Sequence, residues 1–353
     1  MSPPVFSANY QEARSHFLEV ANQCGAAIHS RVHPLTGAKR ETLAMDVAVQ
    51  GRSDASRVLM TTSAVHGVEG FCGSAIQSGL LQQLILPEDV AVVHVHAVNP
   101  YGFSHERRVN EDNVDLNRNF INFGQPLPHN ADYAQIHAQL LPSHWPPTPE
   151  QNALLETQSK IWGDRRMQRA ITSGQYQFSE GVWFGGLKPT WSHTSFRHVL
   201  KNHLSHAKQI AWIDLHTGLG PSGHGERIFA CTDNGVTLQR ARQWWGQGIT
   251  SIYDGSSSSA FLTGLMWMSV IEECPHAEYT GIALEYGTLP INDMLMALRA
   301  DHWLHIHPEA SDELKQSIKA QIFAAFYTDT DVWREQIISQ AREAMFQAVE
   351  GLK

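Results

Sequence analysis

Apolar residues recur along this chain with helical spacing in some segments and in short β-branched runs in others. Helical spacing first appears over residues 6–24 and ends at Gly25. The short apolar runs are bounded by glycine, proline and asparagine, which is typical of strands. The predicted strands cover residues 42–51, 57–67, 90–100, 207–218, 226–233 and 279–288.

Predicted helices separate these strands, at residues 70–84 and at about 189–205, and the segment 291–353 is mostly helical. Alternating strands and helices predict an α/β fold: a mixed, mostly parallel twisted sheet with helices on both faces. We expect a single domain over residues 1–353. Residues 121–188 are rich in proline and contain a predicted polar helix near 149–172, and we expect them to form an insertion in that domain.

Composition narrows the class of partner. The chain has 353 residues and a formal net charge of -9, which disfavours nucleic acid or an anionic membrane as the main partner. No apolar run approaches the length of a membrane span, and the first residues lack the features of a signal peptide. The four cysteines are far apart and form no C-x-x-C pair. These features predict reduced thiols and a cytoplasmic location. They indicate no oligomeric state.

Polar residues follow several of the strands, and three of them suit a metal. His66 and Glu69 come directly after the apolar run that ends near Val65, and His216 ends the strand "IDLH". Two imidazoles and one carboxylate, with a fourth position left open, are typical of a catalytic zinc site. Asp214 lies two residues before His216 and therefore shares its face of the strand. By itself, H-x-x-E is also common in an ordinary polar turn, and His216 can equally bond a loop.

A second polar cluster lies in "NPYGFSHERRVNEDNVDLNRNF", residues 99–120. The planar guanidinium of Arg118 can hold a carboxylate through two hydrogen bonds, and Arg108 can stabilise a developing oxyanion. The alternative is a solvated loop with salt bridges.

The ordered set of motifs resembles a known family. H-x-x-E, N-P-x-G, R-x-N-x-x-x-V-D-L-N-R-N-F, a strand-end histidine and a late-strand glutamate occur in that order over residues 58–288. Together they resemble the zinc metallocarboxypeptidases and their relatives, the aspartoacylase and succinylglutamate desuccinylase group. The "VDLNRNF" stretch is most similar to bacterial carboxypeptidases that act on murein peptides and to their cytoplasmic relatives.

The resemblance implies a role for individual residues. It implies one zinc ion per chain, held by His66, Glu69 and His216, with Asp115 bonded to the first histidine. Arg108 then polarises the scissile carbonyl, and Glu285, in "GIALEYGT", is the general base and acid. The residues expected to bind the substrate are Asn117, Arg118 and Tyr253.

Some positions depart from the family pattern. Asn113 stands where relatives usually have glycine, and Tyr101 where many have aspartate. Tyr253 lies far upstream of Glu285, at an unusual spacing for the tyrosine that often assists catalysis.

The favoured function is that of a zinc-dependent hydrolase, a metallocarboxypeptidase that removes the C-terminal residue of a peptide. A deacylase of N-acyl amino acids is the first alternative, because it shares the ligands and the Asn-Arg pair. That group usually carries a β-rich C-terminal domain, whereas the end of this chain is predicted to be helical. The second alternative is a non-catalytic binding protein on the same fold, which the intact Glu285 disfavours.

Overall fold

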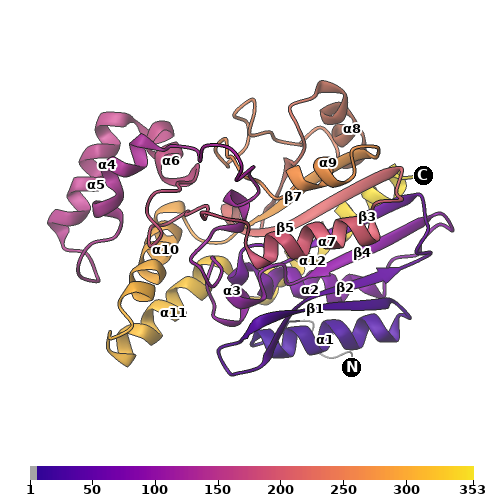
Figure 1. Cartoon of the computed structure of the whole chain (residues 1–353), viewed down its shortest axis with the longest axis horizontal. Coiled ribbons are helices and arrows are strands. Elements are labelled where there is room, and N and C mark those ends of the chain that lie inside the picture. The colour runs from indigo at the N-terminus through magenta and orange to yellow at the C-terminus, as the bar shows by residue number, and fades with distance from the viewer. Residues whose placement is uncertain (1–5) are drawn as a thin grey trace.

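A seven-stranded sheet forms the centre of the computed structural model, which describes residues 6–353 (Figure 1). The strand order is β1-β2-β4-β3-β5-β7-β6. The strands are β1 (Ala27–Thr36), β2 (Thr42–Gln50), β3 (Arg57–Thr62), β4 (Val90–His96), β5 (Gln209–Ser222), β6 (Gly225–Phe229) and β7 (Glu278–Gly287).

The sheet is mixed, as predicted. The central strands β4, β3, β5 and β7 are parallel, whereas β1, β2 and β6 join through antiparallel pairs. Since β1 is antiparallel to β2 and β2 to β4, β1 and the four central strands run in one direction, so the sheet is also mostly parallel. Every residue of β4 is buried, as is usual for a strand covered on both faces.

Strand β1 was not among the predicted strands. It lies at the edge of the sheet and is largely exposed, with His33 its one buried residue. An edge strand of this kind lacks the continuous apolar run by which the central strands are recognised, so its pattern resembles that of a loop.

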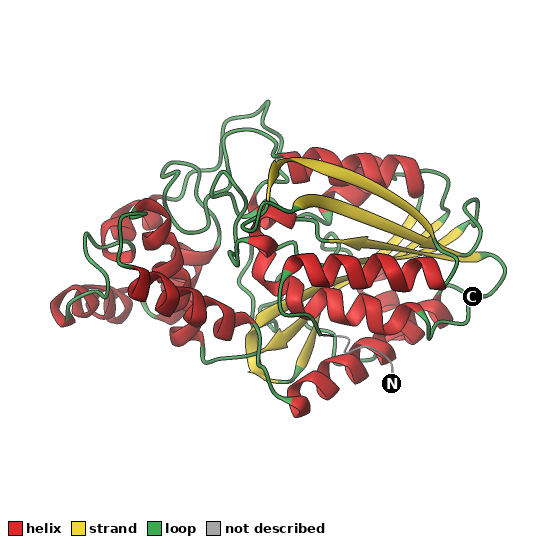
Figure 2. Ribbon diagram, turned by 90° about the horizontal axis from the view of Figure 1, so that it is seen from below, coloured by secondary structure: helices red, strands yellow, loops and turns green. Residues whose placement is uncertain are grey.

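Helices cover both faces of the sheet, as predicted (Figure 2). Helices α1 (Tyr10–Gln23), α2 (Gly70–Leu81) and α12 (Asp331–Gly351) pack on one face, and α7 (Trp191–His203) and α9 (Met268–Glu273) lie against the other. Two further helices are α3 (Pro100–Ser104) and α8 (Gly235–Trp245).

Residues 121–188 contain three helices, α4 (Ala131–Leu140), α5 (Pro149–Trp162) and α6 (Asp164–Thr172). These helices lie beyond one end of the sheet in both views (Figures 1 and 2). The single helix predicted near 149–172 is therefore wrong, and α4 was not predicted. Gly163 separates α5 from α6 because its φ of 77° lies in the left-handed region, which continues no right-handed helix.

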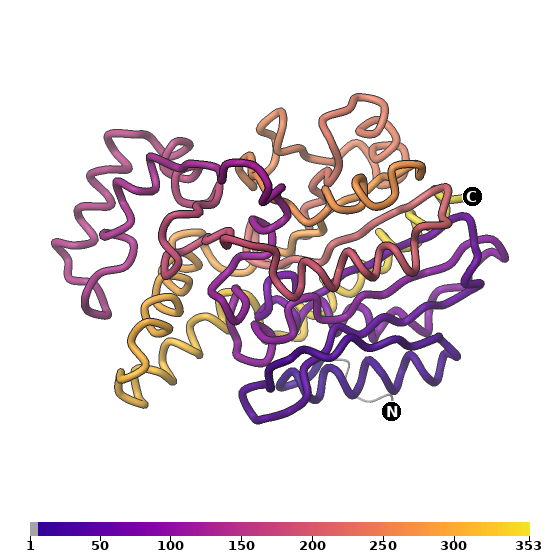
Figure 3. Tube along the Cα trace, viewed as in Figure 1, coloured from indigo at the N-terminus to yellow at the C-terminus, as the bar shows by residue number. Residues whose placement is uncertain are grey.

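The segment 291–353 is helical, as predicted, with α10 (Ile291–Ile306), α11 (Asp312–Phe326) and α12 (Asp331–Gly351). The trace shows α12 returning along the sheet toward its far end (Figure 3). Trp333 donates to the carbonyl of Gly287 at 2.9 Å, which ties α12 to the end of β7. Within residues 6–353, no helix combines the length and the apolar character that a membrane span requires.

Candidate metal centre and active site

The loop after β3 carries two of the predicted ligands. The chain leaves β3 through Ala64, whose φ of 53° is unusual for a residue with a side chain. His66 then precedes a short 3-10 turn, η1 (Gly67–Glu69), which leads directly into α2. A Cβ atom on Gly67 would lie 2.0 Å from the backbone of Gly102, so this position requires glycine. The turn is therefore pressed against α3, and the N–H of Gly67 donates to the carbonyl of Arg108 at 3.0 Å.

The third predicted ligand comes from the neighbouring strand β5. Thr62, at the end of β3, pairs with Asp214 on β5, so that His216 extends two residues beyond the end of β3. His216 in turn lies opposite Glu285 on β7. Parallel strands end at the same edge of a sheet, and this register brings the three segments together at that edge.

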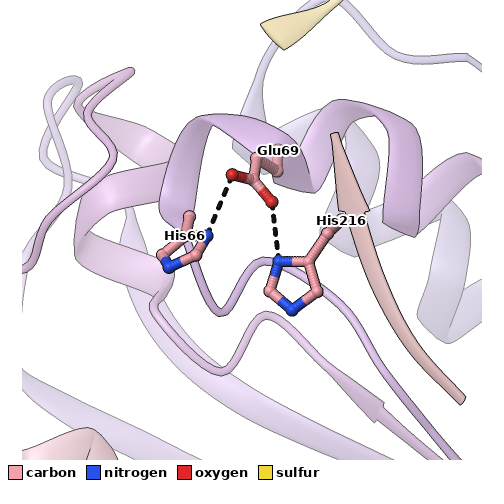
Figure 4. A group of neighbouring side chains, drawn as sticks. All are labelled: His66, Glu69 and His216. Carbon is pink, nitrogen blue, oxygen red and sulfur yellow. Dashed lines mark hydrogen bonds and ion pairs between the residues drawn. The ribbon is translucent and has the colours of Figure 1, made fainter. Parts of the chain in front are cut away.

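Glu69 lies between the two histidines (Figure 4). Its Oε1 is 2.9 Å from Nδ1 of His66, and its Oε2 is 2.9 Å from Nδ1 of His216. One ligand atom from each residue lies within 4.8 Å of the others, and all three side chains are buried. The structure thus brings the three predicted ligands together from two separate segments.

A carboxylate lies beside Nε2 of each histidine, the outer ring nitrogen that points away from Glu69. Asp115 Oδ1 is 3.2 Å from Nε2 of His66, and Asp214 Oδ2 is 2.8 Å from Nε2 of His216. The other oxygen of Asp214 accepts from the hydroxyl of Thr62. Such carboxylates orient metal-binding imidazoles and leave Nδ1 to face the metal. The predicted contact of Asp115 is present, and Asp214 forms the equivalent contact on the other side.

The charges of the site suit a divalent cation. Four carboxylates, those of Glu69, Asp115, Asp214 and Glu285, are buried near two guanidiniums, those of Arg108 and Arg118. With neutral histidines, four negative and two positive charges leave a net charge of minus two. Two imidazole nitrogens and one carboxylate are also the donor set that zinc prefers at catalytic sites. The residues present therefore fit a zinc ion.

The pKa shifts express the same excess of negative charge. Burial, and then the charge of Glu69, raise the pKa of Glu285 to about 8. Burial opposes protonation of His216, but Asp214 and Glu69 outweigh it and raise the pKa of that histidine well above its ordinary value. Without a bound cation, protons on Glu285 and His216 therefore balance part of the negative charge of the site.

Arg108 lies at the rim of the donor set. Its Nε donates to Asp115 at 3.1 Å and its Nη1 to Glu69 at 3.1 Å. Nη2 lies 2.9 Å from Nε2 of His66. A cation bound between the histidines would compete with Arg108 for Glu69, which would leave terminal N–H groups of the arginine for a substrate oxygen.

Arg118 is fully buried and held by backbone carbonyls. Its Nε donates to the carbonyl of Thr172 at 2.9 Å, Nη2 donates to the same oxygen, and Nη1 donates to the carbonyl of Asn117 at 2.8 Å. A guanidinium has five N–H groups, so one remains on each terminal nitrogen. Those two N–H groups form the fork that can bind a carboxylate with two parallel hydrogen bonds.

One cavity of about 530 Å³ joins these groups. Six of the predicted residues line it, namely His66, Arg108, Asn117, Arg118, His216 and Glu285. Glu69 and Asp115 lie behind this surface and are almost fully buried.

The structure does not bring Tyr253 to the cavity lining. Its hydroxyl donates to the carbonyl of Cys231 at 2.9 Å, and its ring packs near Phe261. This geometry does not support the predicted contact between Tyr253 and a substrate. The small-residue loop that follows Tyr253 was the basis for predicting this contact. The adjacent residue Ile252 lines the cavity instead.

The departure at Asn113 has a backbone explanation. Its φ is 60°, a left-handed conformation that glycine adopts freely and asparagine tolerates better than most residues. Its side chain also accepts a hydrogen bond from Arg107 at 3.0 Å. Asparagine therefore preserves the turn that precedes Asp115.

Sequence reasoning missed much of the cavity wall. Residues Leu265 and Trp267, together with Met167 and Ile171 of α6, line the cavity. They are apolar residues in segments without a recognisable motif. The chain carried no local signal for them, because only the folding of those segments over the sheet edge exposes them to the cavity.

One solved structure shares the overall fold of this chain at a TM-score above 0.5, and two others are less similar. Bovine thrombin-activatable fibrinolysis inhibitor, solved in complex with tick carboxypeptidase inhibitor, superposes with a TM-score of 0.52 at 10% identity, covering 98% of this chain and 97% of that one. Carboxypeptidase A from Helicoverpa armigera gives 0.44 at 12% identity, covering 90% and 73%. An aspartoacylase family protein from Mesorhizobium loti gives 0.35 at 12% identity, covering 79% and 66%. No curated protein matches the sequence.

This likeness concerns the fold alone, and it is the carboxypeptidase-like α/β fold that the motifs predicted. Residues 6–340 match the family described as "Protein of unknown function (DUF2817)", and the chain belongs to that family.

Proposed function

We propose that this protein is a zinc-dependent hydrolase that cleaves an amide bond next to a free carboxylate, with a peptide losing its C-terminal residue as the preferred reaction. One observation carries the proposal. A two-histidine, one-glutamate donor set, a buried glutamate of raised pKa and a buried arginine with two uncommitted N–H groups meet in one cavity.

The proposed ligands are His66, Glu69 and His216, one zinc ion per chain. When bound, zinc polarises a carbonyl oxygen and lowers the pKa of water toward about 7. Asp115 and Asp214 hold the outer nitrogen of each histidine, which keeps Nδ1 available to the metal.

Glu285 is the proposed general base and acid. The backbone N–H of Leu219 donates to Oε1 at 3.1 Å, which leaves Oε2 to take the proton of the attacking water. Burial raises the pKa of the carboxyl group, which strengthens Glu285 as the base that takes this proton and keeps the group protonated until the leaving amine accepts the proton. A zinc ion bound at Glu69 would lower the pKa of Glu285 again in part, so that Glu285 is ionised when zinc is bound.

The two arginines complete the proposal. Arg118 binds the free carboxylate through its two uncommitted N–H groups and so positions the amide bond. Arg108 donates to the oxygen that becomes negative as the tetrahedral species forms. The mostly apolar cavity lining lowers the local dielectric constant, which strengthens both interactions.

A substrate screen tests this function. The zinc-loaded protein is assayed against N-blocked dipeptides, the same dipeptides with an amidated C-terminus, and N-acyl amino acids. We expect cleavage of the free-carboxylate dipeptides and little cleavage of the amidated ones. Equal cleavage of free and amidated peptides would contradict the exopeptidase reaction.

A deacylase of N-acyl amino acids is the second candidate. A cavity of about 530 Å³ is large enough for such a small molecule, and Arg118 would bind its carboxylate in the same way. The helical segment α10–α12 stands where that group usually has a β-rich domain, which favours the peptidase. Faster turnover of N-acyl amino acids than of dipeptides would reverse this order, and no turnover of either class would favour a binding protein.

A further inference from the structure

The proposed chemistry leaves one wall of the cavity without a role. This wall begins at residues 264–267, which form hydrogen bonds with the segment that carries Arg118. The N–H of Phe120 donates to the carbonyl of Gly264 at 3.1 Å, and the N–H of Met266 donates to Oδ1 of Asn117 at 3.0 Å. A Cβ atom on Gly264 would lie 2.4 Å from the carbonyl oxygen of Arg118, so the two backbones are in contact. Leu265 and Trp267 are thereby fixed beside the carboxylate-binding arginine.

The sheet supplies the rest of this wall. Ala283 lies two residues before Glu285 on β7, on the same face of the strand and about 7 Å away along it. Ile228 on β6 pairs directly with Ala283, and Ala230 follows one row further from the catalytic edge. An apolar surface therefore begins one row behind the proposed general base. We define the apolar wall as Ile228, Ala230, Leu265, Trp267 and Ala283.

The apolar wall itself contains no charged side chain. Asp214 of β5 pairs with Ala283 and also lines the cavity, but one of its oxygens accepts from Thr62 and the other is bonded to His216. Asp164 lines the cavity from α6, but it is solvent-exposed, so water screens its charge. Among the described lining residues, the guanidiniums are those of Arg108 and Arg118, which the proposed reaction already uses.

We propose that the apolar wall is the pocket for the side chain of the residue that bears the free carboxylate, and that this residue is large and apolar, such as leucine or phenylalanine. The inference rests on the proposed function. A substrate carboxylate on Arg118 places the attached Cα beside Leu265, and the side chain then has the apolar wall in front of it. A basic or acidic side chain would enter the same space without a counterion and lose its hydration.

Competition among C-terminal residues tests this inference. The zinc-loaded, full-length protein is assayed with N-blocked glycyl dipeptides that end in phenylalanine, leucine, alanine, lysine or glutamate. We expect kcat/KM for the phenylalanine and leucine substrates to exceed that for alanine by about ten- to a hundred-fold, because a large side chain is buried. Lysine and glutamate are expected below alanine. A lysine or glutamate substrate that equals the leucine substrate would overturn the inference.

A variant that fills the pocket adds a second test. Ala230→Leu is expected to lower kcat/KM for the phenylalanine substrate by about ten-fold or more relative to the alanine substrate, since only the larger side chain needs the space. Ala138→Leu makes the same change on exposed α4 and is expected to preserve wild-type selectivity. An unchanged ratio of phenylalanine to alanine in Ala230→Leu would contradict the pocket assignment.

Leu265→Ala covers the case in which Ala230→Leu does not fold. It enlarges the pocket and removes apolar contact, so the ratio of leucine to alanine should fall by about three- to ten-fold. No change in that ratio would contradict the pocket assignment. These experiments distinguish a failure of the apolar pocket from a failure of the proposed hydrolase function. Hydrolysis with a preference for basic or acidic residues contradicts the apolar pocket alone, whereas an absence of hydrolysis contradicts the proposed function.

Discussion

Replacing Arg118 with lysine keeps the positive charge but removes the two-pronged hydrogen-bonding geometry. In the structure, backbone carbonyls of Thr172 and Asn117 take three N–H groups of Arg118, and the two that remain can meet a carboxylate. A lysine ammonium has three N–H groups on one atom, so it cannot satisfy both carbonyls and also hold two carboxylate oxygens.

The expected magnitude follows from one lost charge-assisted hydrogen bond. Such a bond contributes roughly 1.5–3 kcal/mol, and about 1.4 kcal/mol corresponds to a factor of ten. Arg118→Lys should therefore reduce kcat/KM for a free-carboxylate substrate by roughly 12- to 140-fold. Because Arg118 also anchors Thr172, the variant should lose stability as well, by about 1–3 kcal/mol for a carbonyl left without a partner.

The assay compares free and amidated substrates in both proteins. Amidation removes the carboxylate, so it should slow the wild type at least as much as Arg118→Lys does. It should have little further effect on the variant, since two changes that remove one contact do not add. Thermal unfolding separates the stability loss from the catalytic loss. Fully additive effects of amidation and substitution would refute the assignment of Arg118 to the substrate carboxylate.

Further predictions concern the metal and the base. Purified protein should contain about one zinc per chain, and His216→Ala should lose the metal and the activity while staying folded; full metal content in that variant would contradict the ligand set. Glu285→Gln should keep zinc and lower kcat by roughly 10²–10⁴-fold, and near wild-type turnover would assign the base elsewhere. Asp214→Asn should weaken zinc binding by about 10- to 100-fold in a chelator competition, because His216 loses the group that orients it. In metal-free protein, the pKa of Glu285 is raised from 4.5 to about 8 by burial and by Glu69, so the folded state holds a proton that the unfolded state releases. The free energy of unfolding should therefore fall as pH rises from about 5 to 8, with the same sign from His216, and denaturant titrations of Glu285→Gln should show a shallower fall.

Much of the centre of the fold was predictable from the sequence. The central strands are buried on both faces, so their apolar runs are continuous and bounded by turn residues. The sequence also predicts the helical segment 291–353, where the structure has α10, α11 and α12. The exposed edge strand β1 and the division between α5 and α6 at Gly163 lacked such signals.

The candidate ligands were also predictable, but through order rather than spacing alone. His66 and Glu69 are three residues apart, and that pair occurs in many turns. The ordered motifs through Arg108, Asp115 and Glu285 made a zinc site the better interpretation, and the structure brings these residues to one sheet edge. Tyr253 shows the limit of this reasoning, because a local resemblance did not determine where its hydroxyl points.

The residues that can carry the chemistry are recognisable from their side chains, because imidazole, carboxylate and guanidinium groups keep their properties at any position in the chain. Which of these residues meet depends on the tertiary fold. His216 reaches His66 and Glu69 because β5 pairs with β3 in one register, and a shift of a single residue would turn His216 to the other face of the sheet. The apolar wall is likewise a product of folding, since residues of β6, β7 and the 264–267 segment are distant along the chain and meet only where the sheet and its covering loops pack together.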